Sequence, residues 1–317
     1  MALLEVRDLC VRYQVRTPWF GKQRWLYAVN HVSFTLDRGE TVGLVGESGC
    51  GKSTLGRALV RLEKPSSGSI LLSGKDLAAA KGKELLAMRR RFQMIFQDPY
   101  GSLNPRLSIF SSLDEVIALH CRLPKEARRE KAAGLLEKVG LTADALNRYP
   151  HQFSGGQRQR IGIARALAAD PEFLVADEPV SALDVSVQAA IVNLLQDIQR
   201  ESRTAILFIA HDLAVVEHIS ARIMVMYLGN IVESAPAREL VASPRHPYTE
   251  ALLSAVPSPD GGLGERIRLT GEVPSPLDPP SGCPFHERCP YVSDRCRREK
   301  PPVTEEDGRA FSCWHPR

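Results

Sequence analysis

Hydrophobic residues along the chain fall into short runs with the spacing of β-strands and longer segments with the spacing of helices. Residues 29–36 alternate strictly, with Val32, Phe34 and Leu36 on one face, which predicts a strand that is buried on one side. Continuous apolar runs, typical of strands buried on both faces of a parallel sheet, lie at 41–45, 173–176, 205–210 and 223–227. Shorter strands are predicted at 3–6 and 69–72.

Segments with helical spacing alternate with these runs. From Lys52 onward, Leu55, Leu59 and Leu62 lie on one face of a predicted helix. Further helices are predicted at 113–119, 125–139 and 158–168. Buried strands that alternate with helices are typical of an α/β fold with a parallel sheet. A Pro/Gly-rich stretch at 257–280 then separates a short cysteine-bearing tail from the rest, which predicts a domain boundary.

The overall composition excludes several classes of protein. The chain has 317 residues, 44% hydrophobic and 25% charged, which suits a well-packed globular protein of about two domains. Its formal net charge of +4 comes from Lys and Arg scattered among 37 acidic residues, without the basic stripe that nucleic-acid binders usually carry. No apolar run approaches the roughly 18 residues that cross a bilayer, and Glu5 comes too early for a signal peptide. The sequence therefore predicts a cytoplasmic protein without a membrane span.

A glycine-rich loop between the strand at 41–45 and the helix from Lys52 predicts a phosphate site. Residues 46–54 fit the G-x-x-x-x-G-K-[ST] pattern of a P-loop. Backbone N–H groups and the helix N-terminus would hold phosphate oxygens, Lys52 would neutralise the β and γ phosphates, and Ser53 would offer its hydroxyl to Mg²⁺. The predicted ATP-binding residues of this loop are Gly46, Ser48, Gly49, Cys50, Gly51, Lys52, Ser53 and Thr54.

Two adjacent acids end the apolar strand at 173–176. Because side chains alternate along a strand, Asp177 and Glu178 point in different directions. One carboxylate can hold Mg²⁺ while the other faces the γ phosphate. We assign Asp177 to the metal and Glu178 to polarising the attacking water.

A second helix start suited to an anion follows at Ser154, Gly155, Gly156 and Gln157. One nucleotide needs only one P-loop, so a second anion-binding helix start suggests a site that is completed across two subunits. In that arrangement this element caps the γ phosphate of a nucleotide that the partner holds.

In this order, the motifs resemble those of the ATP-binding cassette (ABC) family, over about residues 1–260. The matching elements are Walker A at 46–54, a Q-loop at Gln97, the signature at 153–157 with Phe153 where Leu is common, Walker B at 173–177 followed by Glu178, a D-loop at Ser181-Ala182-Leu183-Asp184 and an H-loop at His211. The resemblance implies a P-loop NTPase (RecA-like) fold, with a parallel sheet core, an antiparallel β subdomain and an α-helical subdomain at about 98–158. Residues 261–317 would form a small Cys-rich C-terminal extension.

The resemblance also implies roles for single residues. Tyr13 would stack on adenine, with Tyr27 as the competing aromatic. Gln97 would ligate Mg²⁺ together with Ser53 and Asp177, and would link the metal site to the transmembrane subunits. His211 would contact the γ phosphate and steady Glu178, and Asp184 would line the nucleotide site. The implied catalytic set is Glu178, His211, Lys52 and Gln97.

Three stretches, at 98–106, 149–157 and 245–253, resemble the dipeptide/oligopeptide/nickel import ATPases. That branch implies a second ATPase subunit in a heterodimer, two transmembrane permease subunits and, through them, an extracytoplasmic solute-binding protein. The chain would then lie peripherally on the cytoplasmic face of the inner membrane, with its helical subdomain facing the permease. Three alternatives stay open: an importer of nickel or another metal chelate, a soluble cassette ATPase acting on nucleic acid, and a P-loop kinase or GTPase.

Four cysteines gather in the tail, namely Cys283, Cys289, Cys296 and Cys313. Their spacing lacks the C-x₂₋₄-C knuckle usual in zinc sites. They match the tail of some peptide-import ATPases, which carries a [4Fe–4S] cluster, and that resemblance implies a structural cluster here. The alternatives are zinc held by the cysteines, with or without His286 or His315, and free thiols.

Overall fold

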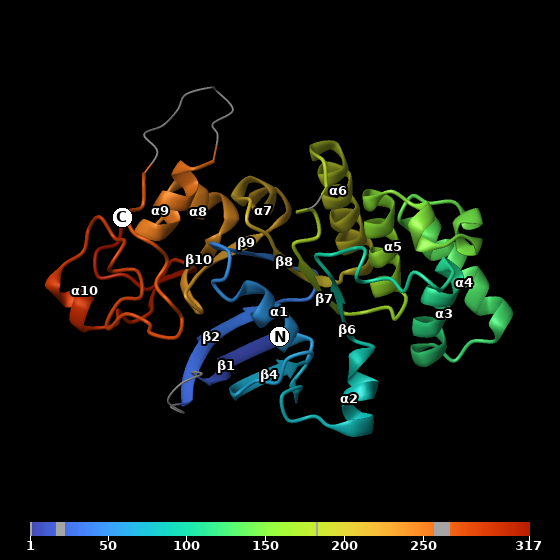
Figure 1. Cartoon of the computed structure of the whole chain (residues 1–317), viewed down its shortest axis with the longest axis horizontal. Coiled ribbons are helices and arrows are strands. Elements are labelled where there is room, and N and C mark those ends of the chain that lie inside the picture. Colours follow the sequence, from blue (N-terminus) through green and yellow to red (C-terminus); the bar gives the residue numbers. More distant parts are fainter. Residues whose placement is uncertain (1, 17–22, 182, 257–266) are drawn as a thin grey trace. The chain divides into compact units, whose positions relative to one another are not determined.

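The computed structural model describes residues 2–16, 23–181, 183–256 and 267–317 (Figure 1). These residues form two compact units. Unit 1 comprises residues 1–36, 41–78 and 209–317, and unit 2 comprises residues 37–40 and 79–208. The predicted boundary between residues 260 and 261 lies within 257–266, outside the described residues, and stays a prediction.

Unit 1 contains an antiparallel sheet with the strand order β2-β1-β4-β5. Its strands are β1 (Leu4–Arg16), β2 (Gln23–Leu36), β4 (Ser67–Leu72) and β5 (Lys75–Asp76). In Figure 1, β1, β2 and β4 lie side by side in blue. The alternation of Val32, Phe34 and Leu36 puts all three in the core, as predicted for a strand buried on one side.

The other strands of unit 1 follow the order β11-β12-β10-β9-β3. They are β3 (Thr41–Val45), β9 (Arg222–Tyr227), β10 (Asn230–Pro236), β11 (Thr304–Glu306) and β12 (Arg309–Phe311). β3 and β9 are parallel and almost wholly buried, which explains their continuous apolar sequences. The short tail strands continue this sheet: β12 pairs antiparallel with β10, and β11 pairs antiparallel with β12.

The described part of unit 1 contains five helices: α1 (Lys52–Leu59), α7 (Leu213–Ile219), α8 (Ala237–Ala242), α9 (Pro247–Ser254) and α10 (Asp294–Arg298). α1 buries Leu55 and Leu59 but leaves Leu62 beyond its end and exposed. The helix from Lys52 is therefore one turn shorter than its apolar spacing suggests. Within the described ranges, no helix is both long and apolar enough to cross a membrane.

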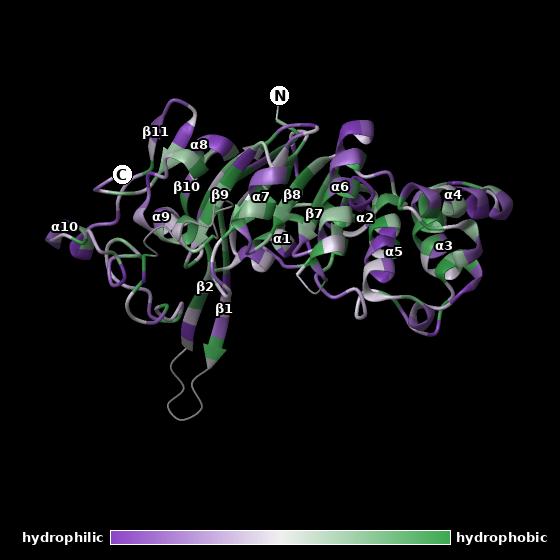
Figure 2. Cartoon of the chain, turned by 90° about the horizontal axis from the view of Figure 1, so that it is seen from above, coloured by the Kyte–Doolittle hydropathy of each residue, from purple (hydrophilic) through white to green (hydrophobic). Residues whose placement is uncertain are grey.

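Unit 2 contains the strand order β8-β7-β6, with β6 and β7 parallel. The strands are β6 (Phe92–Ile95), β7 (Phe173–Asp177) and β8 (Ala205–Ile209), whose last residue belongs to unit 1. Its helices are α2 (Gly82–Arg89), α3 (Ile109–His120), α4 (Lys125–Lys138), α5 (Gly155–Leu167) and α6 (Val185–Ser202), with 3₁₀ turns at Ala143–Asn147 and Pro150–Gln152. Figure 2 shows β7 in the colour of hydrophobic residues and much of α4 in that of hydrophilic ones. The strand is therefore core, whereas the helix has one apolar side only.

Glu172 joins the start of β7 to two arginines of unit 2. Arg91 reaches its carboxylate at 2.5 and 3.1 Å, and Arg38 reaches it at 2.5 Å. The hydrogen bond from Arg91, partly opposed by burial, lowers the pKa of Glu172. A lowered pKa stabilises the fold above the unfolded-state value of about 4.3, and this stabilisation is lost as the pH falls through the folded-state value.

We therefore expect Glu172→Gln to lower the free energy of unfolding by about 1–2 kcal/mol at pH 7 and by less at pH 3. Urea unfolding at both pH values measures the difference. The matched control is Glu130→Gln on exposed α4 surface, which should change neither value by more than about 0.5 kcal/mol. An equal loss at both pH values would show that the ion pair does not carry the pH dependence.

Candidate active site

The P-loop of unit 1 connects β3 to α1 and leaves no room for side chains at two of its glycines. Gly46 has a φ of 154°, and a Cβ there would lie 2.2 Å from the carbonyl oxygen of Met226. Gly51 has a φ of 110°, and a Cβ there would lie 2.0 Å from the carbonyl oxygen of Ala28. Only glycine fits both positions, because each combines a left-handed conformation with close backbone contact.

Lys52 lies within this loop and is only 4% exposed. Its ammonium group donates to the carbonyl oxygens of Gly46, at 2.7 Å, and Glu47, at 3.0 Å. The positive charge of Lys52 is thus held at the start of α1, where the helix N-terminus also favours negative charge. The site predicted for phosphates has the electrostatic character that phosphates need.

The structure also places three other predicted residues of unit 1, one of them in this loop. Cys50 is 4% exposed, and burial raises the pKa of its thiol, so it is a packing residue and not a reactive one. Tyr13 is 37% exposed on β1. Burial raises the pKa of its hydroxyl, and Glu63 and Thr54 are among the neighbours that act on it. The structure therefore brings Tyr13 together with Thr54, at the first turn of α1. His211 follows β8 and is exposed, next to Asp212, which caps α7.

In unit 2, β7 ends at the two predicted acids. Asp177 is 2% exposed, whereas Glu178 is half-buried. The amide of Gln97 donates to the Glu178 carboxylate at 2.9 Å. Glu178 also has a φ of 44°, a left-handed conformation that is uncommon outside glycine and concentrated at functional sites. The structure thus joins the predicted Q-loop residue to the predicted water-polarising carboxylate.

The signature segment begins α5. Ser154 caps this helix: its hydroxyl accepts from the backbone of Gln157 at 3.3 Å, and the side chain of Gln157 accepts from the Ser154 backbone at 3.1 Å. An open cavity of about 580 Å³ adjoins this helix start. Its walls are Gln97, Asp98, Pro99, Tyr100, Ser154, Gly155, Gly156, Ser181, Leu183, Asp184 and Val187. Unit 2 therefore gathers the Q-loop, signature and D-loop residues around one cavity, although Ala182 of the D-loop lies outside the described residues.

The four tail cysteines are unpaired; Cys283 and Cys296 are buried, and Cys289 and Cys313 are half-buried. Burial raises the pKa of Cys283 to about 12 and that of Cys313 to about 11, and neighbouring tail cysteines add to both shifts. Within the described ranges, no three or more His, Cys, Asp or Glu side chains are placed to hold a metal ion.

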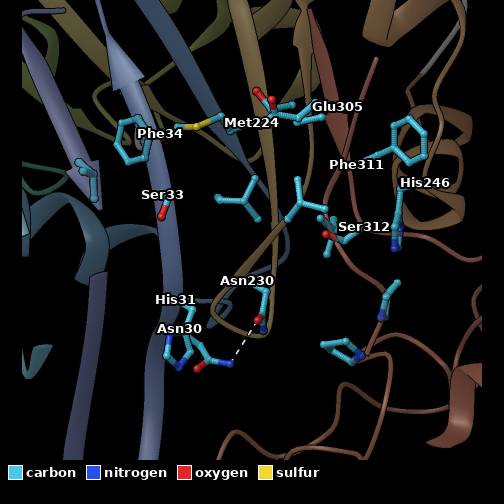
Figure 3. A pocket seen from close by; sticks show the side chains of 18 of the residues that line it. Asn30, His31, Ser33, Phe34, Met224, Asn230, His246, Glu305, Phe311 and Ser312 are labelled. Carbon is cyan, nitrogen blue, oxygen red and sulfur yellow. Dashed lines mark hydrogen bonds between the residues drawn. The ribbon is translucent and has the colours of Figure 1, made fainter. Parts of the chain in front are cut away.

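Another cavity, about 560 Å³ in volume, belongs to unit 1 and lies among β2, β10 and the tail (Figure 3). Asn30 and Asn230 are joined across it by a hydrogen bond of 3.2 Å. Of the predicted site residues described here, only Cys283 lines it. This cavity is therefore separate from the P-loop.

The sequence carries no signal for two residues that hold the P-loop. Tyr248 of α9 accepts a hydrogen bond from the backbone of Glu47 at 2.9 Å. Arg288 of the tail forms two hydrogen bonds with the Glu47 carboxylate, at 2.7 and 3.0 Å. Both partners are more than 200 positions away along the chain, so no local pattern could have identified them.

Comparison with known proteins agrees with this geometry. The pattern of the family described as "ABC transporter" matches residues 29–181, and that of "Oligopeptide/dipeptide transporter, C-terminal region" matches residues 232–296. A Sinorhizobium fredii protein named "Probable peptide ABC transporter ATP-binding protein" is 55% identical over 98% of this chain and 89% of its own length. The "Di/tripeptide transport ATP-binding protein" of Pseudomonas aeruginosa is 49% identical over 99% of this chain and 97% of its own.

A solved structure supports the fold. A dimeric ATP-binding cassette in a post-hydrolysis state, bound to ADP and phosphate, is 28% identical to this chain. Its TM-score is 0.67, covering 74% of this chain and 99% of that one. The predicted P-loop NTPase fold is thereby confirmed. The chain belongs to the family of ABC transporter ATP-binding proteins, which are ATPases coupled to transport.

Proposed function

We propose that this chain is the ATP-hydrolysing subunit of an ABC importer for di- and oligopeptides. The observation that carries the proposal is near-full-length similarity, at 55% and 49% sequence identity, to proteins named for peptide and di/tripeptide transport. The match of residues 232–296 to the oligopeptide/dipeptide transporter C-terminal region supports it independently of the ATP-binding motifs. Both favour peptides over nickel chelates, and transport over an action on nucleic acid.

In the proposed reaction each of these groups of the site has one task. Lys52 would neutralise the β and γ phosphates, and Ser53, Gln97 and Asp177 would hold Mg²⁺, which would supply charge neutralisation at the phosphates. Glu178 polarises the attacking water, and its hydrogen bond with Gln97 supports this because it orients the carboxylate. His211 contacts the γ phosphate, and Tyr13 stacks on adenine. Catalysis then consists of positioning and charge neutralisation, without a covalent intermediate.

We propose that a second ATPase subunit completes the site. The cavity beside Ser154 and Gly155 is open, and the backbone N–H groups at the start of α5 favour an anion. In the assembled pair, this helix start and Asp184 cap the γ phosphate of the nucleotide held by the partner. ATP binding then closes the two cassettes, and hydrolysis lets them separate.

Two permeases and, through them, a solute-binding protein complete the proposed transporter, with this chain peripheral at the cytoplasmic face of the membrane. Residues 98–158 supply the proposed permease-facing surface. Tyr100 is 64% exposed, and the guanidinium carbon of Arg158 lies over its ring, 3.9 Å from the centre of the ring. An exposed aromatic that is held by a cation in this way offers a rigid contact for a partner helix.

We also propose that Cys283, Cys289, Cys296 and Cys313 hold a [4Fe–4S] cluster in an extension at 261–317. Four unpaired thiols in one short tail match its donor number, and a cluster accepts wider ligand spacing than a single ion. In the described residues these thiols are not placed to hold a metal ion, so cluster binding would require them to draw together. Zinc is the competing ion, although the tail lacks the C-x₂₋₄-C knuckle usual in zinc sites. A bound cluster would cross-link the tail. Anaerobically purified protein should absorb near 400 nm and contain about four irons; a colourless protein with full zinc occupancy would refute the cluster.

Peptide import is tested in proteoliposomes that contain this chain, its second ATPase, both permeases and the solute-binding protein. Radiolabelled dialanine uptake should depend on ATP on the cassette side and disappear with Lys52→Ala. A nickel–histidine chelate is the competing substrate. ATP-dependent uptake of the chelate, without uptake of dialanine or trialanine, would overturn the peptide assignment.

A further inference from the structure

We propose that Arg288 of the tail is a positioning residue of the nucleotide site, which holds the P-loop for ATP by neutralising and orienting Glu47. The inference rests on the proposed role of the P-loop in binding ATP. It adds a function for the tail that does not depend on a cluster: residues near the C-terminus set the affinity of a loop near the N-terminus.

The contact between Arg288 and Glu47 has the geometry of a strong ion pair. The two terminal nitrogens of Arg288 donate to the two carboxylate oxygens of Glu47, at 2.7 and 3.0 Å. The side chain of Arg288 is 8% exposed and that of Glu47 is 28% exposed. Two parallel hydrogen bonds fix orientation as well as distance, and low exposure limits screening by water and salt. The pair therefore differs from ordinary surface salt bridges, which contribute little.

The backbone of Glu47 contacts other residues of the site, so the position of its side chain affects the rest of the loop. Its carbonyl oxygen accepts from the ammonium of Lys52 at 3.0 Å, and its N–H donates to the hydroxyl of Tyr248 at 2.9 Å. One residue thus connects the tail, α9 and the cation expected to bind the phosphates. Displacement of the Glu47 side chain would move the carbonyl that orients Lys52.

The tail segment around Arg288 is itself anchored in the core of unit 1. Phe285 is 1% exposed, and its ring lies 5.2 Å from that of Tyr227 and 5.4 Å from that of Tyr248. The rings of Tyr227 and Tyr248 are 4.7 Å apart. Arg288 therefore approaches Glu47 from a rigid support, three residues after a buried aromatic anchor.

Charge gives a second reason for the pair. Glu47 places a carboxylate within a loop that is expected to bind a highly charged anion. Without Arg288, this negative charge would oppose ATP; with Arg288, the pair is neutral. Loss of Arg288 should therefore cost more affinity than loss of the Glu47 charge, a difference that a purely structural contact does not predict.

The test measures the dissociation constant of ATP for the full-length chain, by displacement of a fluorescent ATP analogue. We expect Arg288→Ala to weaken binding about tenfold, within the range by which residues remote from a ligand change its affinity. Glu47→Gln should weaken binding by about threefold or less, and the double variant should resemble Glu47→Gln more than Arg288→Ala. Arg288→Lys, which keeps the charge but loses the two-point geometry, should fall between wild type and Arg288→Ala.

Arg295→Ala is the matched control, because Arg295 is a tail arginine whose partner, Glu299, is exposed. It should leave the dissociation constant unchanged within about twofold. Wild-type affinity in Arg288→Ala, or strictly additive effects in the double variant, would overturn the inference. If Arg288→Ala fails to fold, Arg288→Lys and Glu47→Gln decide: equal losses of tenfold or more in both would contradict the charge argument. A wild-type chain that does not bind ATP would instead refute the proposed function.

Discussion

Glu178→Gln is expected to lower ATP turnover by about 10²- to 10⁴-fold, the usual contribution of a positioned general base, and to leave ATP binding intact. Gln keeps the size of the side chain but cannot polarise the attacking water as a carboxylate does. Gln97 can still hydrogen-bond the new amide oxygen through its own amide at the 2.9 Å separation, so the local arrangement should persist. Phosphate release and the dissociation constant of ATP, measured on the same preparation, separate the two effects.

Glu172→Gln is the matched control for this prediction. Glu172 precedes β7 and Glu178 follows it, so the same chemical change is made at opposite ends of one strand. The control should keep turnover within about threefold of wild type at pH 7, because Glu172 pairs with Arg91 and has no predicted part in hydrolysis. If Glu178→Gln turns over ATP at more than about a tenth of the wild-type rate, Glu178 is not the residue that polarises the attacking water.

Lys52→Ala is expected to weaken ATP binding by at least about 100-fold, because it removes the positive charge of the P-loop that is expected to face the phosphates. Lys52 is 4% exposed and is held by the carbonyl oxygens of Gly46 and Glu47. Lys52 is the one Lys or Arg in the sequence of the P-loop, residues 46–54. Isothermal titration calorimetry with ATP and Mg²⁺ measures the loss directly.

Lys75→Ala removes an exposed lysine from β5 in the same unit and should leave ATP affinity unchanged within about twofold. The melting temperature of both variants shows whether the fold is kept. An Lys52→Ala protein that melts like wild type and binds ATP with undiminished affinity would contradict the assignment of this loop.

Local sequence patterns were sufficient wherever one segment supplies both the structure and the chemistry. The run at 41–45 forms β3 with its predicted ends, because a short run free of charged residues, with Val42, Leu44 and Val45, followed by Gly46 specifies a buried strand and its turn. The order of P-loop, Q-loop, signature and Walker B motifs was sufficient to identify the family. The cap formed by Ser154 and Gln157 is likewise local, since both residues lie within one helical turn.

Features that depend on distant pairs could not be predicted. The pairing of Arg288 with Glu47 joins positions 241 residues apart, and neither residue belongs to a pattern that names the other. β11 and β12 are each three residues long, and they become strands only by pairing with each other and with β10. The left-handed conformation of Glu178 also arises from its surroundings, because a glutamate alone does not favour a φ of 44°.

Sandwiching of ATP between two cassettes is tested most directly with Gly155→Asp. A Cβ at Gly155 meets only Leu183, at 3.7 Å, so the variant should fold, and Asp at the start of α5 suits the helix. Its carboxylate would nevertheless occupy the proposed place of the γ phosphate. The measurement is the ATPase rate of this chain paired with its second ATPase subunit. We predict loss of ATP-dependent pairing and at least about a 100-fold lower rate at the site that this signature completes, with Gly155→Ala close to wild type. Full turnover by the isolated monomeric chain, unchanged by Gly155→Asp, would contradict the composite site.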